Sequence, residues 1–275
     1  MKRGREGTLR GTALGCAVLL LAFGIGIWND ARLPEAVGCR SEDIAAVTDV
    51  SFLPQAQKAS TDSAAKTVCL TFDDGPSENT QAILEILARQ DVPATFFVIG
   101  AQNNKAYLPL VRQEEEQGHQ VALHSCSHEY DEIYASPEAY WADIDALKQK
   151  LSAYIDTDGI DCLRFPGGST NTVSHKYGGS GIMKTLKAQA AERGYHVIDW
   201  NVCADDAVGG HPSARRVYEN TIEDVGEKSV CVVLMHDTAA TDTTVEALPD
   251  IITWFQEKGY AFCTVNDMLK RQEEN

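Results

Sequence analysis

The stretch TVCLTFDDGP, residues 67–76, joins a short apolar run to two adjacent aspartates and a Gly-Pro turn. An apolar run of this length, bounded by turn residues, predicts a buried β-strand with Asp73 and Asp74 at its carboxyl end. Adjacent carboxylates repel each other, and removing either one from water is costly. The pair therefore indicates either a solvated surface turn or a site where a cation or a reaction needs both groups.

Six further apolar runs follow this one, and helical patterns separate most of them. The runs cover residues 94–99, 120–124, 161–165, 195–200, 229–235 and 260–264. Ser136-Pro137 predicts the start of one intervening helix, and Gly194 predicts the end of another. Strands that alternate with helices predict a parallel α/β sheet covered on both faces. This pattern fits a doubly wound sheet and a small barrel equally well.

An uncharged stretch of 18 residues, GTALGCAVLLLAFGIGIW (11–28), precedes the strands and follows four basic residues, Lys2, Arg3, Arg5 and Arg10. This length just crosses a bilayer, and the positive charges predict a cytoplasmic N-terminus. No small-x-small cleavage site follows, so we expect residues 1–28 to be a basic tip and an uncleaved, single-pass signal anchor in the cell membrane. A cleaved signal and secretion are the alternative. Residues 29–65 are expected to form a linker, and residues 66–275 one extracellular domain.

Composition excludes some partners and some kinds of site. The 275 residues carry a formal net charge of −16, which would repel a nucleic acid. The eight cysteines include no CxxC pair, which argues against a zinc ribbon or a thioredoxin motif. Cys69, Cys231 and Cys263 lie in apolar runs and are expected to behave as small hydrophobic residues. The sequence leaves a disulfide among Cys126, Cys162 and Cys203 open.

Chemically active side chains end or follow the predicted strands. Besides the Asp73–Asp74 pair, they are His124 and His128 in HSCSH, Arg164 in RFPGGS, Asp199, Asp205 and Asp206, and His236 and Asp237 in LMHD. In barrels and open α/β sheets alike, the carboxyl edge of the strands is where sites form. Each group alone is compatible with an ordinary surface or core residue. Their repeated placement on one edge predicts a shared site.

One carboxylate and two imidazoles of this set match a metal site. His124 and His128 are four residues apart, a spacing that lets both rings reach one cation. With Asp74 they supply three protein ligands, the number that catalytic zinc sites use. A cation there would neutralise Asp74 and leave Asp73 free to accept a proton, while a histidine across the site protonates the leaving group.

These motifs resemble those of the polysaccharide deacetylase family, the NodB-homology or carbohydrate esterase 4 group, over residues 66–270. TFDDGP resembles the first motif of the family, HSCSH the second, RFPGG the third and LMH the fifth. The fourth motif is less clean, because WNVCADDA aligns Trp200 and Asp206 with the family pattern but has Ala207 where a second Trp is expected. The resemblance implies an irregular (β/α)7 barrel, in agreement with the seven predicted strands.

The resemblance also implies roles for individual residues. Asp73 would be the general base and His236 the general acid. One divalent metal, most often zinc and alternatively cobalt or a similar ion, would be held by three ligands: Asp74, His124 and His128.

Four further residues would support these groups. Arg164 would orient Asp73, and Asp206 would hold His236, with Asp205 and Asp199 as less favoured alternatives to Asp206. The backbone N–H of Gly167 would help to hold the oxyanion, and Leu234 would pack beside the acetyl methyl group.

The resemblance implies a metal-dependent hydrolase that removes N-acetyl groups from a polysaccharide. An anchor that holds the domain outside the membrane favours the N-acetylglucosamine of peptidoglycan as its substrate. Two alternatives stay open. One is an O-acetyl esterase on xylan or a chitin deacetylase that uses the same site. The other is a non-catalytic glycan-binding relative tethered to the membrane.

Overall fold

The computed structural model describes residues 66–273. The predicted signal anchor at 11–28 and the linker at 29–65 lie outside the described residues. None of the helices within the described part combines the length and the hydropathy needed to span a bilayer.

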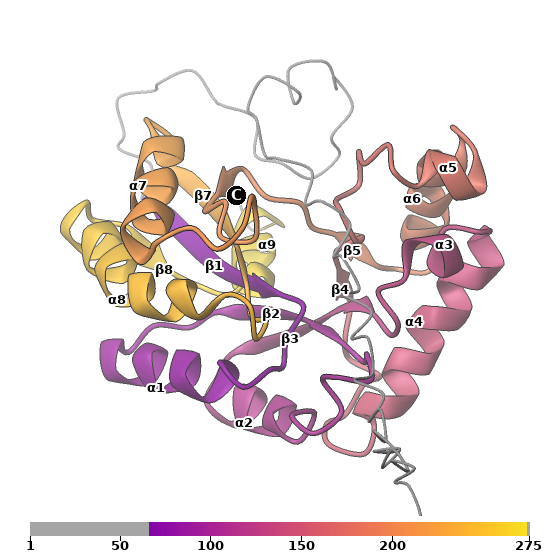
Figure 1. The fold of residues 1–275 in the computed structure, drawn as a ribbon, viewed down its shortest axis with the longest axis horizontal. Coiled ribbons are helices and arrows are strands. Elements are labelled where there is room, and N and C mark those ends of the chain that lie inside the picture. Colours follow the sequence, from indigo (N-terminus) through magenta and orange to yellow (C-terminus); the bar gives the residue numbers. More distant parts are fainter. Residues whose placement is uncertain (1–65, 274–275) are drawn as a thin grey trace, which may run out of the picture. The chain divides into compact units, whose positions relative to one another are not determined.

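Parallel strands form the centre of the domain (Figure 1). They are β1 Thr67–Asp73, β2 Thr95–Ile99, β3 Gln120–Ser125, β4 Cys162–Leu163, β5 His196–Val197, β6 Val202–Cys203, β7 Val230–His236 and β8 Ala261–Phe262. Hydrogen bonds join them in the order β5-β4-β3-β2-β1-β7-β6, and every pair is parallel. β8 pairs with the start of β1, at Thr67 and Val68. Because β5 and β6 do not pair, the curled sheet stays open between them.

All seven predicted strands are present, and the α/β class with parallel strands is confirmed. Three differ in length, since two residues form each of β4, β5 and β8, where the apolar runs 161–165, 195–200 and 260–264 predict five or six. β6 was not predicted. It follows β5 after four residues with no helix between them, and a two-residue strand has no periodicity to detect.

Helices surround the strands, most of them on the outer side (Figure 1). They are α1 Thr80–Gln90, α2 Leu110–Glu116, α3 Tyr130–Ile133, α4 Pro137–Leu151, α5 His175–Gly178, α6 Ile182–Glu192, α7 Ala214–Val225, α8 Asp242–Glu257 and α9 Val265–Glu273. The predicted start of α4 is confirmed, because the Ser136 hydroxyl accepts a hydrogen bond from Ala139 N at 3.2 Å. The predicted stop after α6 is also confirmed, since Gly194 has a φ of 79°.

Side chains along β1 point alternately into two apolar clusters, one on each face of the sheet. Val68, Leu70 and Phe72 belong to the larger apolar cluster, which packs under the helices. Cys69 points the other way and belongs to a second cluster that includes Val265, Met268 and Leu269 of α9. Thr71 and Asp73 follow Cys69 on the same inner side, because side chains alternate along a strand. The inner side is therefore apolar near α9 and polar at the carboxyl end of the strands.

The cysteines contribute to this apolar packing. The six cysteines within the described residues are buried free thiols, so no disulfide joins Cys126, Cys162 and Cys203. Cys69, Cys231 and Cys263 are buried in the apolar clusters, as the sequence predicts.

Candidate active site

The two aspartates of TFDDGP lie in a tightly braced turn after β1. Asp73 is the last residue of β1, and it stands in register with His236 of β7. Asp74 adopts a left-handed φ of 68°, a conformation that costs a non-glycine residue about 1–3 kcal/mol. The Asn104 side-chain amide holds the turn by donating to the carbonyls of Asp74 at 2.8 Å and Pro76 at 2.9 Å. The surrounding structure thus fixes the direction of each carboxylate.

Asp74, His124 and His128 converge at the carboxyl ends of β1 and β3. Asp74 Oδ1 lies 3.4 Å from Nε2 of His124 and 3.2 Å from Nε2 of His128. This oxygen is buried and has no hydrogen-bond partner. Within residues 66–273, these are the three side chains grouped closely enough to bind one metal ion. Ligands that surround zinc tetrahedrally at about 2.0–2.1 Å lie roughly 3.4 Å from each other, so this cluster fits such an ion.

Backbone contacts turn both imidazoles towards Asp74. His124 Nδ1 lies 2.7 Å from the carbonyl oxygen of Arg164. A carbonyl only accepts, so Nδ1 carries the hydrogen and Nε2 presents its lone pair to the cluster. His128 has a φ of 60°, and its N–H donates to the Ser125 hydroxyl at 2.9 Å. Both metal-facing nitrogens are therefore set by the fold.

Asp143 of α4 anchors the segment between the two histidines, a role that the sequence did not indicate. Its carboxylate accepts from the Ser125 hydroxyl at 2.7 Å, from Cys126 N at 2.7 Å and from Ser127 N at 2.8 Å. In the sequence Asp143 is an ordinary acidic residue on an amphipathic helix, so no local signal marks it. The contact depends on how α4 packs beside β3.

Replacing Asp143 with alanine is expected to lower the affinity for Zn²⁺ about 10–100-fold, the range for losing an outer partner of a metal site. The loss follows because three donors of the 125–127 segment lose their acceptor. Competition with a chromophoric chelator measures the affinity. Asp145→Ala, at an exposed position of the same helix, is the matched control and should bind like the wild type. Equal affinity of the two variants would contradict the anchoring role.

Arg164 is fully buried and binds Asp73. Its Nη1 donates to Asp73 Oδ1 at 2.6 Å and to the Thr71 hydroxyl at 2.9 Å. Its Nε donates to the carbonyl of Ile198 at 2.9 Å, and its guanidinium lies 4.0 Å from the centre of the Phe97 ring. A charge-assisted bond to one carboxylate oxygen leaves the other, Oδ2, facing His124 Nε2 at 3.8 Å. Asp73 is thereby oriented beside the cluster and is not one of its three members.

His236, the last residue of β7, lies next to Asp73 of β1 and forms hydrogen bonds with Asp206. Asp206 Oδ1 is 2.8 Å from His236 Nδ1, and its Oδ2 accepts from His236 N and from the Thr244 hydroxyl, both at 2.7 Å. Of the three carboxylates that the sequence left open, Asp206 is the one that contacts His236. Asp199 accepts from Ser169, and Asp205 accepts from the Cys203 thiol.

Gly167 and Leu234 are the remaining two residues to which the motifs assign a role. Gly167 is exposed, with a φ of 77°, in the turn after β4. Leu234 is buried two residues before His236 and so shares its side of β7. Trp200 packs against this region, since a Cβ on Gly168 would lie 3.1 Å from its ring.

Asp237 follows His236 and supports the TFDDGP turn through the residues that come directly after it. Its carboxylate accepts from the Ser77 hydroxyl at 2.9 Å and from the Thr80 hydroxyl at 2.6 Å. A Cβ on Gly75 would lie only 2.4 Å from Asp237 Oδ2, so this close approach requires glycine. Burial raises the pKa of Asp237 to about 6, although both hydroxyls stabilise its charge. The LMHD motif thus carries both a site residue and a support for the turn, and only the first of these roles is predicted from the sequence.

The electrostatics of the cluster favour a bound cation. Burial opposes the charge of Asp74, but the imidazoles of His128 and His124 outweigh burial and hold the pKa of this carboxyl well below its usual range. Burial lowers the pKa of His128, which favours the neutral ring that binds metals. Burial also acts against a charge on His124, yet Asp73 and Asp74 raise the pKa of His124. A bound cation would compete with the proton on His124 for the negative charge of the two aspartates.

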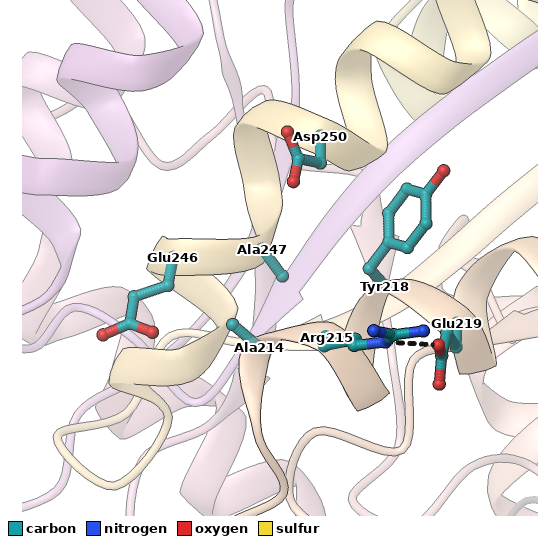
Figure 2. A pocket seen from close by; sticks show the side chains of 7 residues that line it. All are labelled: Ala214, Arg215, Tyr218, Glu219, Glu246, Ala247 and Asp250. Carbon is teal, nitrogen blue, oxygen red and sulfur yellow. Dashed lines mark hydrogen bonds and ion pairs between the residues drawn. The ribbon is translucent and has the colours of Figure 1, made fainter.

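A separate pocket of about 410 Å³ lies between α7 and α8 (Figure 2). Its charged lining comes from Arg215 and Glu219 of α7 and from Glu246 and Asp250 of α8. Arg215 Nε and Glu219 Oε1 are 2.7 Å apart. None of the predicted site residues lines this pocket, so it is distinct from the cluster at the strand ends.

Comparison with known proteins identifies the family of this chain. The family described as "Polysaccharide deacetylase" matches residues 60–202, just over half of the chain. A peptidoglycan-N-acetylglucosamine deacetylase of Bacillus cereus is 32% identical over 203 residues, which cover 72% of this chain and 68% of that protein.

Solved structures show the same similarity. The catalytic domain of a peptidoglycan N-acetylglucosamine deacetylase from Eubacterium rectale is 38% identical, with a TM-score of 0.69 over 77% of this chain and 94% of that one. A CE4 esterase from Streptococcus mutans is 29% identical, with a TM-score of 0.63 over 73% of this chain and 86% of that one. The chain therefore belongs to the polysaccharide deacetylase family.

Proposed function

We propose that this polysaccharide deacetylase is metal-dependent and removes N-acetyl groups from the N-acetylglucosamine of peptidoglycan. The observation that carries the proposal is the cluster of Asp74, His124 and His128, together with two supported groups at the same strand ends, Asp73 with Arg164 and His236 with Asp206. The similarity to deacetylases whose names state this substrate supports the choice of glycan.

The three ligands would hold a divalent ion, and a donor set of one carboxylate and two imidazoles favours zinc over harder ions. When bound, such an ion polarises a carbonyl group and lowers the pKa of a neighbouring water. Cobalt or a similar ion would suit the same ligands.

Residues of the chain account for the proton transfers of amide hydrolysis. Asp73 takes a proton from the water that adds to the acetyl carbon, using the oxygen that Arg164 does not occupy. The Gly167 N–H stabilises the negative charge that develops on the acetyl oxygen. As the C–N bond breaks, His236 gives its Nε2 proton to the nitrogen, and its Nδ1 stays bonded to Asp206. The products are acetate and a free amine on the sugar.

The proposal includes a location. Residues 11–28 would anchor the chain in the plasma membrane by a single span, and residues 29–65 would link this span to an extracellular domain. The supporting observations are the length of the uncharged stretch and the basic residues before it. Fractionation of cells that express the full chain tests this part independently of the chemistry.

Acetate and free amine released by the full chain from several glycans test the function. The substrates are peptidoglycan, chitin oligomers and acetylxylan, each with and without a chelator and with Zn²⁺ or Co²⁺ restored. We expect equal amounts of acetate and amine from peptidoglycan, loss of both with chelator and recovery with metal.

Other outcomes would contradict the proposal in distinguishable ways. Acetate without new amine, released from acetylxylan, would indicate an O-acetyl esterase. Activity on chitin oligomers but not on peptidoglycan would indicate a chitin deacetylase. No hydrolysis of any glycan, with less than one metal per chain, would indicate a non-catalytic glycan-binding relative.

A further inference from the structure

The turn after β4 contains a backbone hydrogen-bond donor, the N–H of Gly167, that has no partner among the described residues. Gly167 is exposed, and its backbone N–H makes no hydrogen bond to any part of the chain that the structure describes. A Cβ at this position would lie 2.7 Å from the hydroxyl oxygen of Tyr130. The phenol of Tyr130 therefore occupies the space into which a side chain at 167 would project.

Two tyrosines fix this arrangement: Tyr130, the first residue of α3, and Tyr134, which directly follows this helix. The Tyr130 ring packs edge-on against His128, with ring centres 5.7 Å apart, and against Tyr134 at 5.6 Å. The Tyr134 hydroxyl donates to the carbonyl of Pro166 at 2.7 Å. One tyrosine thus holds the 166–167 turn, and the other lies against the next residue of the same turn. Because His128 is a proposed metal ligand, Tyr130 has its ring beside the cluster and its hydroxyl beside Gly167.

The Tyr130 hydroxyl is a second unused donor. It has no hydrogen-bond partner within residues 66–273, although the residue is half-buried. A phenol is protonated at neutral pH and can donate. The Tyr130 hydroxyl and the Gly167 N–H are thus two neighbouring donors without an acceptor in the described part of the chain. Together they form a site for an oxygen atom of a ligand.

We propose that the Tyr130 hydroxyl and the Gly167 N–H together bind the acetyl oxygen of the substrate as negative charge develops on it. This inference rests on the proposed hydrolase function. It also gives a physical reason for glycine at 167, because any side chain there would displace the phenol. Donors aimed at a developing charge accelerate the reaction more than they strengthen binding of the substrate.

Tyr130→Phe tests the proposal by removing one oxygen atom and keeping the ring. We expect kcat to fall about 10²-fold, the lower end for losing one oxyanion donor, with KM and metal content unchanged. Tyr218→Phe, in the distant α7–α8 pocket, is the matched control and should keep the wild-type kcat. An unchanged kcat in Tyr130→Phe, or a higher KM at constant kcat, would overturn the proposal.

A second measurement needs no turnover. Acetate, a product that carries negative charge on its oxygens, is titrated into the zinc-loaded full chain by calorimetry. Tyr130→Phe should weaken acetate binding roughly tenfold or more, as expected for losing a hydrogen bond to a charged group. Equal acetate affinity of the variant and the wild type would overturn the role of Tyr130. A wild type that binds acetate but hydrolyses no acetylated glycan would instead contradict the proposed function.

Discussion

Replacing Asp73 with asparagine is expected to lower kcat about 10²–10⁴-fold, the usual cost of losing a general base. Asparagine keeps the size of the side chain and an oxygen for Arg164, which donates to Asp73 Oδ1 at 2.6 Å. It cannot accept a proton from water, so the chemical step slows while the site stays assembled. Acetate release measures the rate, and elemental analysis of the same sample measures the bound metal.

The neighbouring aspartate provides the contrast for this experiment. Asp74→Asn should lose both activity and metal, because Asp74 Oδ1 is the oxygen that lies 3.2 Å and 3.4 Å from the two imidazoles. Asp73→Asn should lose activity alone. Turnover close to that of the wild type in Asp73→Asn, with metal retained, would contradict the assignment of the base.

Removal of the His236 imidazole is expected to reduce kcat by a similar factor, about 10²–10⁴-fold, the usual cost of losing a general acid. His236→Gln keeps a polar side chain of comparable size. Its metal content should match that of the wild type, since His236 is not one of the three clustered ligands. Loss of metal in this variant would show that His236 acts on the cation site and would contradict its role as the acid.

The partner of His236 should control the pH dependence. Burial alone would lower the pKa of His236, but Asp206 outweighs burial and, with Asp74 and Asp73, raises this pKa to about 10. The imidazole therefore keeps its proton at neutral pH, and activity falls as the pH rises through this pKa. In Asp206→Asn the attractive charge is lost, so the pKa of His236 falls and the alkaline limb of kcat/KM moves to lower pH. An alkaline limb at the wild-type position in Asp206→Asn would contradict this coupling.

Much of the site was predictable because its residues lie at the carboxyl ends of parallel strands in one sheet. Asp73, His124 and His236 each fall at the carboxyl end of an apolar run, and parallel strands bring those ends to one edge. The sequence could not choose by spacing between Asp199, Asp205 and Asp206, since one lies at the end of the run 195–200 and the other two follow it closely. The choice depends on which carboxylate the loop after β6 directs at His236, and β6 is too short to predict.

The supporting residues were not predictable for a different reason. Asp143 and Tyr130 act across contacts between elements, and neither lies in a pattern that distinguishes it from an ordinary helical residue. Asp143 meets the 125–127 segment only because α4 packs beside β3, and Tyr130 reaches Gly167 only because α3 lies beside the turn after β4. Local sequence determines which side chains can react, whereas tertiary packing determines which side chains hold them.

The register between β1 and β7 has a consequence for how this scaffold can diverge. The two strands pair over seven consecutive residues, and the last pair is Asp73 and His236. Neighbouring strands are held about 4.8 Å apart by their hydrogen bonds, so the backbone sets the spacing of the proposed proton acceptor and proton donor. Loops around the rim can therefore lengthen, shorten or change composition to admit another sugar polymer without altering that spacing. Selection for a new glycan would therefore change the loops, while the pairing of β1 with β7 would keep the spacing of the two groups.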